Sequence, residues 1–264
     1  MRHFGLVVLL ALFTTAAYAE EWTHSYPVTG KPELVVDAND ADVDISVGSS
    51  QQVDARVIVH GWKINENLQI SGNQSGNRVE LKLHKTQKTC FGWCNQSIRV
   101  EVHVPRESDL RVHTSDGNIR VDSVRGNLQF ETDDGDVRIR DVEGSLHAET
   151  HDGNINATGR FDVLSLHTGD GDIDAELAAS SSFQPGASQT GWIVRTGNGN
   201  VRLRLPDNFG ADLDVHSGDG NVRVDFPITT AASTRENSLR GKMNGGGVSL
   251  EVRTGDGDIR VEKM

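Results

Sequence analysis

One repeated phrase constrains this chain more than any other feature. It begins at Leu110 as Leu-Arg-Val-His-Thr-Ser-Asp-Gly-Asn-Ile-Arg-Val and returns from Leu128, Leu146 and Leu164. A constant period, here ~18 residues, indicates a repeat architecture. Counted from Thr114 as position one, position three is Asp or Asn, position four is Gly, and position six is Ile or Val. After residue 177 the phrase recurs with insertions, marked by Thr196, Ser217 and Thr254.

Apolar and polar residues alternate on both sides of the Asp-Gly pair, which predicts strand, turn and strand. We expect the glycine because such a turn favours a positive φ, which is costly for other residues. Asp and Asn beside the glycine can hydrogen-bond their own backbone.

One such unit is too small to stand alone. Its four or so inward side chains contribute about 6–12 kcal/mol, whereas ordering its backbone costs about 18–36 kcal/mol. The units must therefore stack, as in repeat proteins. The sequence predicts an all-β, single-domain β-solenoid or β-helix, with one coil per Asp-Gly repeat. Ile119, Val137, Ile155 and Ile173 should then form a single file. The competing geometry is a meander of hairpins folded into a sandwich.

Residues 1–19 predict a secretory signal peptide. Arg2 precedes an apolar run from Leu6 to Phe13, and Ala17-Tyr18-Ala19 resembles a cleavage site. This places the mature protein in the periplasm or at the cell surface. The run is too short for a membrane-spanning helix, and we expect no span in the mature chain. The formal net charge of -12 disfavours nucleic acid or an anionic membrane as a partner.

The rest of the chain divides into two regions of one continuous domain. Residues 20–109 predict an antiparallel β capping region, in which 34–45 form a degenerate capping coil with Ala41 in place of the glycine. Residues 110–264 predict the solenoid, with loop insertions at 178–190 and 226–247. Such insertions either protrude as binding loops or cover an edge of the stack.

Cys90 and Cys94 are the two cysteines, and they fall between two predicted strands at 78–84 and 97–104. We expect these strands to form a hairpin with Phe91 and Trp93 at its tip. In an exported protein an even number of cysteines favours a disulfide. Free thiols and redox chemistry are the alternatives, although redox pairs usually have two intervening residues.

The recurring Thr-Gly-Asp-Gly-Asp-Ile phrase, a glycine-rich stretch at 245–247 and the last phrase from Ser249 to Glu262 resemble the bacterial putative-adhesin family. The resemblance covers roughly residues 34–261. It implies an all-β stack of β-strand repeats on the envelope side of the cell. It implies no catalytic residue.

The acidic turns offer the main candidate for chemistry. Stacked position-three carboxylates would repel one another by about 1 kcal/mol per pair in water. An arginine at position seven would offset this repulsion. Examples are Arg138 beside Asp136 and Arg260 beside Asp258. Two coils lack that arginine. Their oxygen-bearing side chains predict a Ca²⁺ site formed by Asp152, Asn154, Asp170, Asp172 and Asp174. The alternative is a solvated acidic face.

No nucleophile elbow, phosphate loop or dinucleotide motif is present in the sequence. We therefore predict a non-catalytic structural or adhesion-like module without a cofactor, apart from the Ca²⁺ hypothesis. Its unknown envelope or extracellular partner would be a glycan or a protein. The alternatives are a carbohydrate-active enzyme on a β-helix scaffold and a Ca²⁺-stabilised β-roll.

Overall fold

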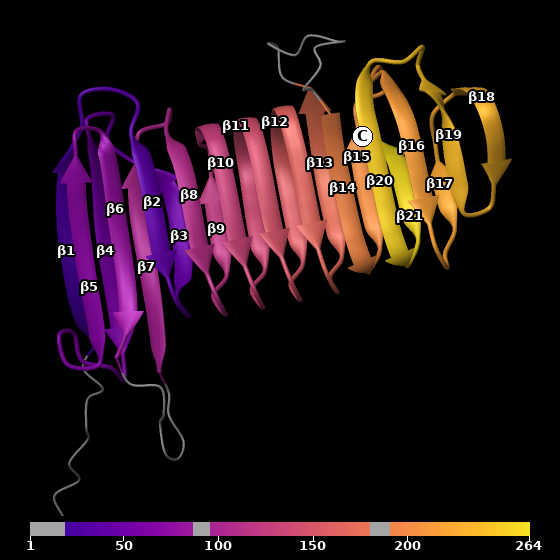
Figure 1. The fold of residues 1–264 in the computed structure, drawn as a ribbon. Helices are drawn as coiled ribbons and strands as arrows, with labels where there is room; N and C mark the ends of the chain where they lie inside the picture. Colours follow the sequence, from indigo (N-terminus) through magenta and orange to yellow (C-terminus); the bar gives the residue numbers. More distant parts are fainter. Residues whose placement is uncertain (1–18, 87–95, 180–190) are drawn as a thin grey trace, which may run out of the picture.

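The computed structural model describes residues 19–86, 96–179 and 191–264, apart from the side chains of 230–234. The signal peptide prediction thus falls outside the described residues, except for Ala19. Across the described ranges the chain forms strands and no helix (Figure 1). The all-β prediction is confirmed.

The strands form two rows, which we call face A and face B. In order along the stack, face A contains β5 (Leu68–Ser75), β6 (Arg78–Lys85), β2 (Glu33–Ala38), β8 (Asp109–Thr114), β10 (Arg125–Thr132), the second halves of β11 (Val137–Thr150) and β12 (Ile155–Thr168), β14 (Gly191–Asn198), β20 (Val248–Asp256), β16 (Ala211–Ser217), β19 (Ser238–Met243) and β18 (Ile228–Arg235). Face B contains β1 (Glu20–Pro27), β4 (Gln52–His60), β7 (Ser97–Val104), β3 (Asp42–Val47), β9 (Ile119–Asp122), the first halves of β11 and β12, β13 (Ile173–Ala179), β15 (Val201–Leu205), β21 (Ile259–Lys263) and β17 (Val222–Val224).

Equivalent residues of neighbouring coils lie opposite one another. Val137 pairs with Ile119 on one side and with Ile155 on the other, and Ile155 pairs in turn with Ile173. All four are at most 1% exposed, and the inward side chains of both faces form one core. The core is thus a set of apolar columns that run through successive coils.

The order of coils in space differs from their order in the sequence. The last coil, β20–β21, lies between the coils β14–β15 and β16–β17. The first coil, β2–β3, likewise lies between β6–β7 and β8–β9. The prediction that residues 34–45 cap the stack is therefore wrong, because both strands of this coil have neighbours on either side.

The prediction that the strands on either side of the cysteines pair as a hairpin is also wrong. β6 belongs to face A, where it pairs with β5 and β2, whereas β7 belongs to face B, where it pairs with β4 and β3. Both strands bury one side, so they cover the shared core from opposite faces instead of pairing with each other. Cys90, Cys94, Phe91 and Trp93 lie outside the described residues, and the disulfide stays a prediction.

The insertion at 226–247 contains a β-hairpin. Its strand β19 pairs antiparallel with β16 and with β18, so it extends face A beyond the outermost coil. Phe226 and Met243 are buried at 6% and 0% exposure. This segment therefore covers an edge. The other insertion, at 178–190, is described only as far as Ala179, where β13 ends.

The position-four glycines are required for a different reason from the one predicted. Only Gly257, with φ +146°, has a positive φ among the seven. A Cβ at any of them would instead lie 1.9–2.3 Å from a carbonyl oxygen of the neighbouring coil. Close stacking of the turns therefore selects glycine at this position.

The position-one hydroxyls form hydrogen bonds that connect each turn to the turn of a neighbouring coil. Thr150 is 1% exposed. Its Oγ1 donates a hydrogen bond to the Gly135 carbonyl at 2.9 Å and accepts one from the Gly153 N–H at 3.1 Å. The same contact to the neighbouring glycine carbonyl recurs at Thr132, Thr168, Thr196, Ser217 and Thr254.

Thr150→Val is expected to lower the free energy of unfolding by about 1–3 kcal/mol, because it leaves a buried N–H and a buried carbonyl without their partner. Chemical denaturation measures the change. Thr229→Val, at an exposed position of β18, is the matched control and should change stability by no more than about 0.5 kcal/mol. Equal effects at the two sites would contradict a special role for the buried hydroxyl.

Candidate functional site

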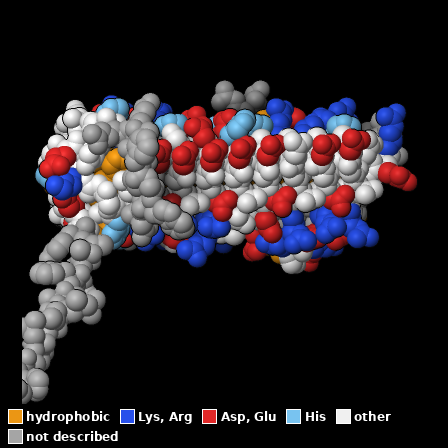
Figure 2. All heavy atoms as spheres, turned by 90° about the horizontal axis from the view of Figure 1, so that it is seen from below, with side chains coloured by type: hydrophobic (Ala, Val, Ile, Leu, Met, Phe, Trp, Pro, Cys, Tyr) orange, Lys and Arg blue, Asp and Glu red, His pale blue; other side chains and the backbone are white. Residues whose placement is uncertain are grey.

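The Asp-Gly turns place a row of polar side chains along one edge of the stack, which we call the turn edge. Figure 2 shows the regular spacing of acidic side chains along it. Its position-three residues are all exposed, and in spatial order they are Asp116, Asp134, Asp152, Asp170, Asn198, Asp256 and Asp219. Neighbours are about 4.8 Å apart, the spacing of adjacent strands.

The surroundings of Asp116 disfavour its charged form. Burial raises the pKa of this carboxyl from its usual value, and the nearby carboxylates of Asp40 and Asp134 raise it further. Asn198 interrupts the row elsewhere, where its Nδ2 donates to Asp170 Oδ1 at 2.6 Å. The row is therefore acidic except at Asn198, which is uncharged and lies between Asp170 and Asp256.

The position-five residues form a hydrogen-bonded ladder behind this row. The side-chain carboxylate of each Asp accepts a hydrogen bond from the backbone N–H of the Asn in the next coil. The side-chain oxygen (Oδ1) of each Asn in turn accepts one from the backbone N–H of the Asp in the next coil. In spatial order the members are Asp42, Asn118, Asp136, Asn154, Asp172, Asn200, Asp258 and Asn221. The alternation keeps carboxylates two coils apart, about 9.6 Å.

This alternation depends on the inserted last coil. In the sequence Asn200 and Asn221 are consecutive members of the ladder, and Asp258 follows both. In space Asp258 lies between them: it donates its backbone N–H to Asn200 Oδ1 at 3.1 Å and accepts from the Asn221 N–H at 3.0 Å. Asp and Asn therefore alternate strictly only when the last coil is placed between the two before it. Sequence reasoning missed this signal, which could have predicted the order of the coils.

Asp258 makes the ladder sensitive to acid. Hydrogen bonds from the backbone N–H and the side chain of Asn221 lower its pKa from the usual value, and Arg260 contributes further. Such a carboxyl stabilises the fold above its unfolded pKa, near 4, and this contribution is lost as the pH falls through the lower folded value. We expect Asp258→Asn to be less stable than wild type at pH 7 and to lose less stability between about pH 5 and pH 2.

Thermal denaturation across this pH range measures the difference. Asp116→Asn is the control of opposite sign, because the pKa of Asp116 is raised. Its ionised form disfavours folding at neutral pH, and protonation relieves this as the pH falls through the folded pKa. This variant should be more stable than wild type at pH 7. The same pH profile for both variants would contradict the assignment.

The arginine compensation predicted at position seven is present. Arg138 Nη2 lies 2.8 Å from Asp136 Oδ2, and Arg260 Nη2 lies 3.6 Å from Asp258 Oδ2. The coil with Asp174 at this position also has cationic partners, which come from the next coil. Arg202 lies in register with Asp174, and Arg204 Nη2 lies 2.9 Å from its Oδ1. Sequence reasoning missed them because an insertion separates the two coils.

The five residues of the predicted Ca²⁺ site lie on adjacent coils, and one oxygen of each of four of them accepts a hydrogen bond. Asp172 Oδ1 accepts hydrogen bonds from the Asn200 N–H and Nδ2, and Asn154 Oδ1 accepts from the Asp172 N–H. Asp170 accepts from Asn198 and Asp174 from Arg204, while Asp152 Oδ1 lies 3.8 Å from His151 Nε2. Over the described residues, no group of three or more His, Cys, Asp or Glu side chains is arranged to hold a metal.

The Ca²⁺ site stays a prediction, and calorimetric titration tests it. Heat of binding at millimolar Ca²⁺ that disappears in Asp172→Asn would support it. No uptake by the wild-type chain would end it.

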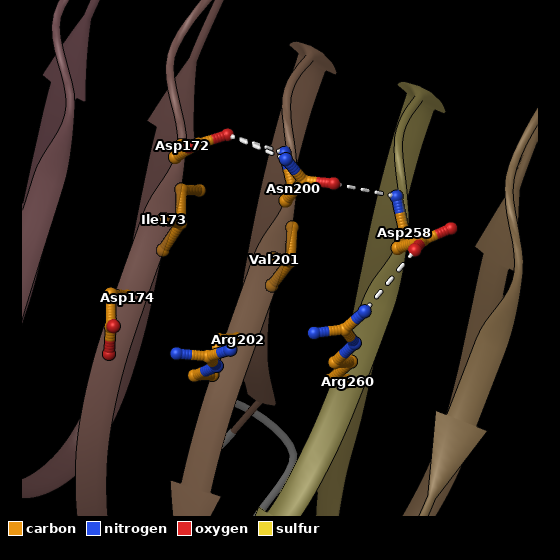
Figure 3. Close-up of a pocket in the computed structure, with 8 residues that line it drawn as sticks. All are labelled: Asp172, Ile173, Asp174, Asn200, Val201, Arg202, Asp258 and Arg260. Atoms are coloured by element: carbon orange, nitrogen blue, oxygen red, sulfur yellow. Dashed lines mark hydrogen bonds and ion pairs between the residues drawn. The ribbon is translucent and has the colours of Figure 1, made fainter.

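A groove of about 290 Å³ lies on face B beside the ladder (Figure 3). Ile173 and Val201 also line it, but their side chains belong to the core and are 1% exposed. Arg202 lies between Asp174 and Arg260 across three neighbouring strands. The side chains that the groove presents to solvent are therefore the polar and charged ones, which donate and accept hydrogen bonds.

Comparison with known proteins assigns the chain to a family. A family model described as Toastrack DUF4097 matches residues 32–131, 107–192 and 190–262. The chain belongs to this family. The resemblance noted in the sequence is confirmed, and the matched segments run from residue 32 to residue 262. No curated protein matches the chain.

Solved structures similar to the chain carry adhesion names. A putative cell adhesion protein from Clostridium sporogenes is 13% identical with a TM-score of 0.42, and the alignment covers 93% of this chain and 100% of that one. A putative adhesin from Bacteroides fragilis is 10% identical (TM-score 0.39; 93% and 97% covered), and one from Parabacteroides merdae is 12% identical (TM-score 0.40; 93% and 96% covered). Within the described ranges, no helix is long and apolar enough to cross a membrane.

Proposed function

We propose that this protein is an exported, non-catalytic β-repeat module that binds an envelope or extracellular partner along the outside of its stack. Its building block is one coil of a β-solenoid per Asp-Gly repeat, with an antiparallel N-terminal portion. The observation that carries the proposal is the turn edge, where exposed side chains repeat in register from Asp116 to Asp219. A repeating row of this kind suits an extended partner with its own repeat, such as a glycan chain, or a complementary protein surface.

The state of the carboxyls supports a binding role over a hydrolytic one. A glycosidase needs one carboxylic acid with a raised pKa to protonate the leaving group. Hydrogen bonds from arginines lower the pKa of Glu21 and of Glu251, and amide hydrogen bonds lower that of Asp258. These three carboxyls serve as hydrogen-bond acceptors. The pKa of Asp116 is raised, and the assay for released reducing sugar tests whether this carboxyl acts as an acid.

A glycan array and a reducing-sugar assay on the same preparation test the proposal. We expect saturable binding without turnover. Binding should fall in a variant in which Asp134, Asp152 and Asp170 are replaced by Asn, and it should persist in a matched triple Asp→Asn variant on the outer faces, at Asp122, Asp212 and Asp214. If the array shows no ligand, a pull-down from envelope extract with the same variants replaces it. Release of reducing sugar would favour the enzyme instead.

Cell fractionation tests the location. Cleavage after Ala19 and recovery of the chain in the periplasmic or surface fraction are expected. Recovery of the uncleaved chain in the cytoplasm would contradict export.

A further inference from the structure

Among the described strands, four are edge strands, two at each end of the stack; Figure 1 shows the two ends. At one end, β1 pairs only with β4 and β5 only with β6 among the described strands. At the other, β17 pairs only with β21 and β18 only with β19 within the same ranges. An edge strand presents unpaired backbone groups that can pair with another chain, and proteins usually protect such edges.

The end formed by β17 and β18 is protected. β17 is only three residues long, and its Val222 N–H already donates to the Glu236 carbonyl at 2.9 Å. β18 departs from regular pairing with β19 at two places, between Thr230 and Ala232 and between Ala232 and Thr234. Short strands and bulges are two common ways to prevent pairing at an edge.

The end formed by β1 and β5 has fewer of these safeguards. β5 is eight residues long, Leu-Gln-Ile-Ser-Gly-Asn-Gln-Ser, with no charged residue and no proline. Its register with β6 is unbroken from Leu68 to Ser75. Only its first residue is covered by the preceding turn, where the Leu68 N–H donates to the Lys63 carbonyl at 3.2 Å and the Leu68 carbonyl accepts from the Asn65 N–H at 2.8 Å. β1 is equally long and regular. The charge of Glu21 is compensated by Arg56 at 2.8 and 3.0 Å, and Pro27 is the last residue of the strand.

The inner side of β1 carries a row of rings. The rings of Trp22 and His24 are 6.0 Å apart, and those of His24 and Tyr26 are 4.5 Å apart. Tyr26 is 3% exposed and packs over Gly72 of β5, where a Cβ would lie 1.8 Å from its hydroxyl. Trp22 is only partly buried and His24 is exposed. The end of the core is thus closed by aromatic side chains that still present surface to solvent.

We propose that this end, which we call the β1–β5 end, is a self-association surface for a second copy of the chain. A two-fold axis perpendicular to the faces places β1 antiparallel to β1 of the second copy and β5 antiparallel to its β5, so both faces continue across the junction. A single strand from another protein would cover only one of the two edges. With Thr23 on the axis, Glu21 faces a serine, so no like charges meet along β1.

Sedimentation velocity on the full chain from micromolar to millimolar concentration tests this inference, which goes beyond the proposed binding role. A reversible monomer–dimer equilibrium is expected. Asn73→Lys adds a charge to β5 opposite Glu80 of β6, so the fold should tolerate it. Association should weaken about fivefold or more. Thr229→Glu, on the protected edge strand β18 and opposite Lys242 of β19, is the matched control, because it too adds a charge opposite one of the other sign, and it should leave association unchanged.

Hydrogen exchange locates the contact independently of the variants. Backbone amides of β1 and β5 should gain protection as the concentration rises, while those of β17 and β18 should not. A chain that stays monomeric at millimolar concentration would overturn the inference. So would a dimer that protects β17 and β18, a dimer unaffected by Asn73→Lys, or protection of β5 that appears only when envelope extract supplies another protein.

Discussion

Gly153→Ala is expected to lower the free energy of unfolding by about 3 kcal/mol, at the upper end of what an overpacked core position costs. The methyl group would lie 2.0 Å from the Gly135 carbonyl oxygen, which belongs to the neighbouring turn. Gly153 is itself buried between two coils, so neither turn can move away without breaking the hydrogen bonds of Thr150. Chemical denaturation with far-ultraviolet circular dichroism measures the loss.

Gly191→Ala is the matched control. Among the described residues, the nearest atom to its added Cβ would be the Ser249 carbonyl oxygen at 3.9 Å, an ordinary van der Waals contact. There the smaller entropy of the unfolded alanine chain should leave stability unchanged or raise it by about 0.4–1 kcal/mol. If Gly153→Ala were as mild as Gly191→Ala, the close approach of the turns could not be the reason for glycine at position four.

The sequence predicts the inside of this protein well because the apolar columns obey a local rule. Position six is always Ile or Val, and a residue that alternates with polar neighbours in a strand must face the core. That rule places Ile119 and Val137 in one file without knowledge of the rest of the chain. The sequence predicts the position of the glycine correctly but not the reason for it. The reason is the close approach of turns from neighbouring coils, and such a contact cannot be inferred from the residues of a single repeat.

The order of the coils depends on contacts that are distant in the sequence. Residues 34–45 resemble a terminal coil because terminal repeats are usually atypical, yet β2 and β3 lie inside the stack. At the candidate site, the paired charges within one strand, such as Asp136 with Arg138, follow from spacing. The partner of Asp174, which is Arg204 at 2.9 Å, lies beyond an insertion, so spacing alone could not supply it.

Truncation after Gly247 is expected to disrupt far more than the residues it removes. The lost coil β20–β21 buries Val248, Leu250, Val252, Ile259 and Val261, each at most 2% exposed. Such side chains contribute about 1.5–3 kcal/mol each, and together they are comparable to the whole stability of a typical domain, about 5–15 kcal/mol. Because this coil lies between β14–β15 and β16–β17, its removal opens a gap inside the stack.

Hydrogen exchange should therefore show loss of protection over residues 211–243, although all of these remain in the truncated chain. β16 would keep only its antiparallel pairing with β19, and β17 would lose its pairing with β21. Removal of residues 20–27 is the control, because β1 lies at an end and pairs with β4 alone among the described strands; its effect should stay near β4 and β5. A synthetic peptide of residues 248–264 should restore protection to 211–243 in the truncated chain. Protection of 211–243 without any peptide would mean that the outer coil and its hairpin fold independently of the inserted coil.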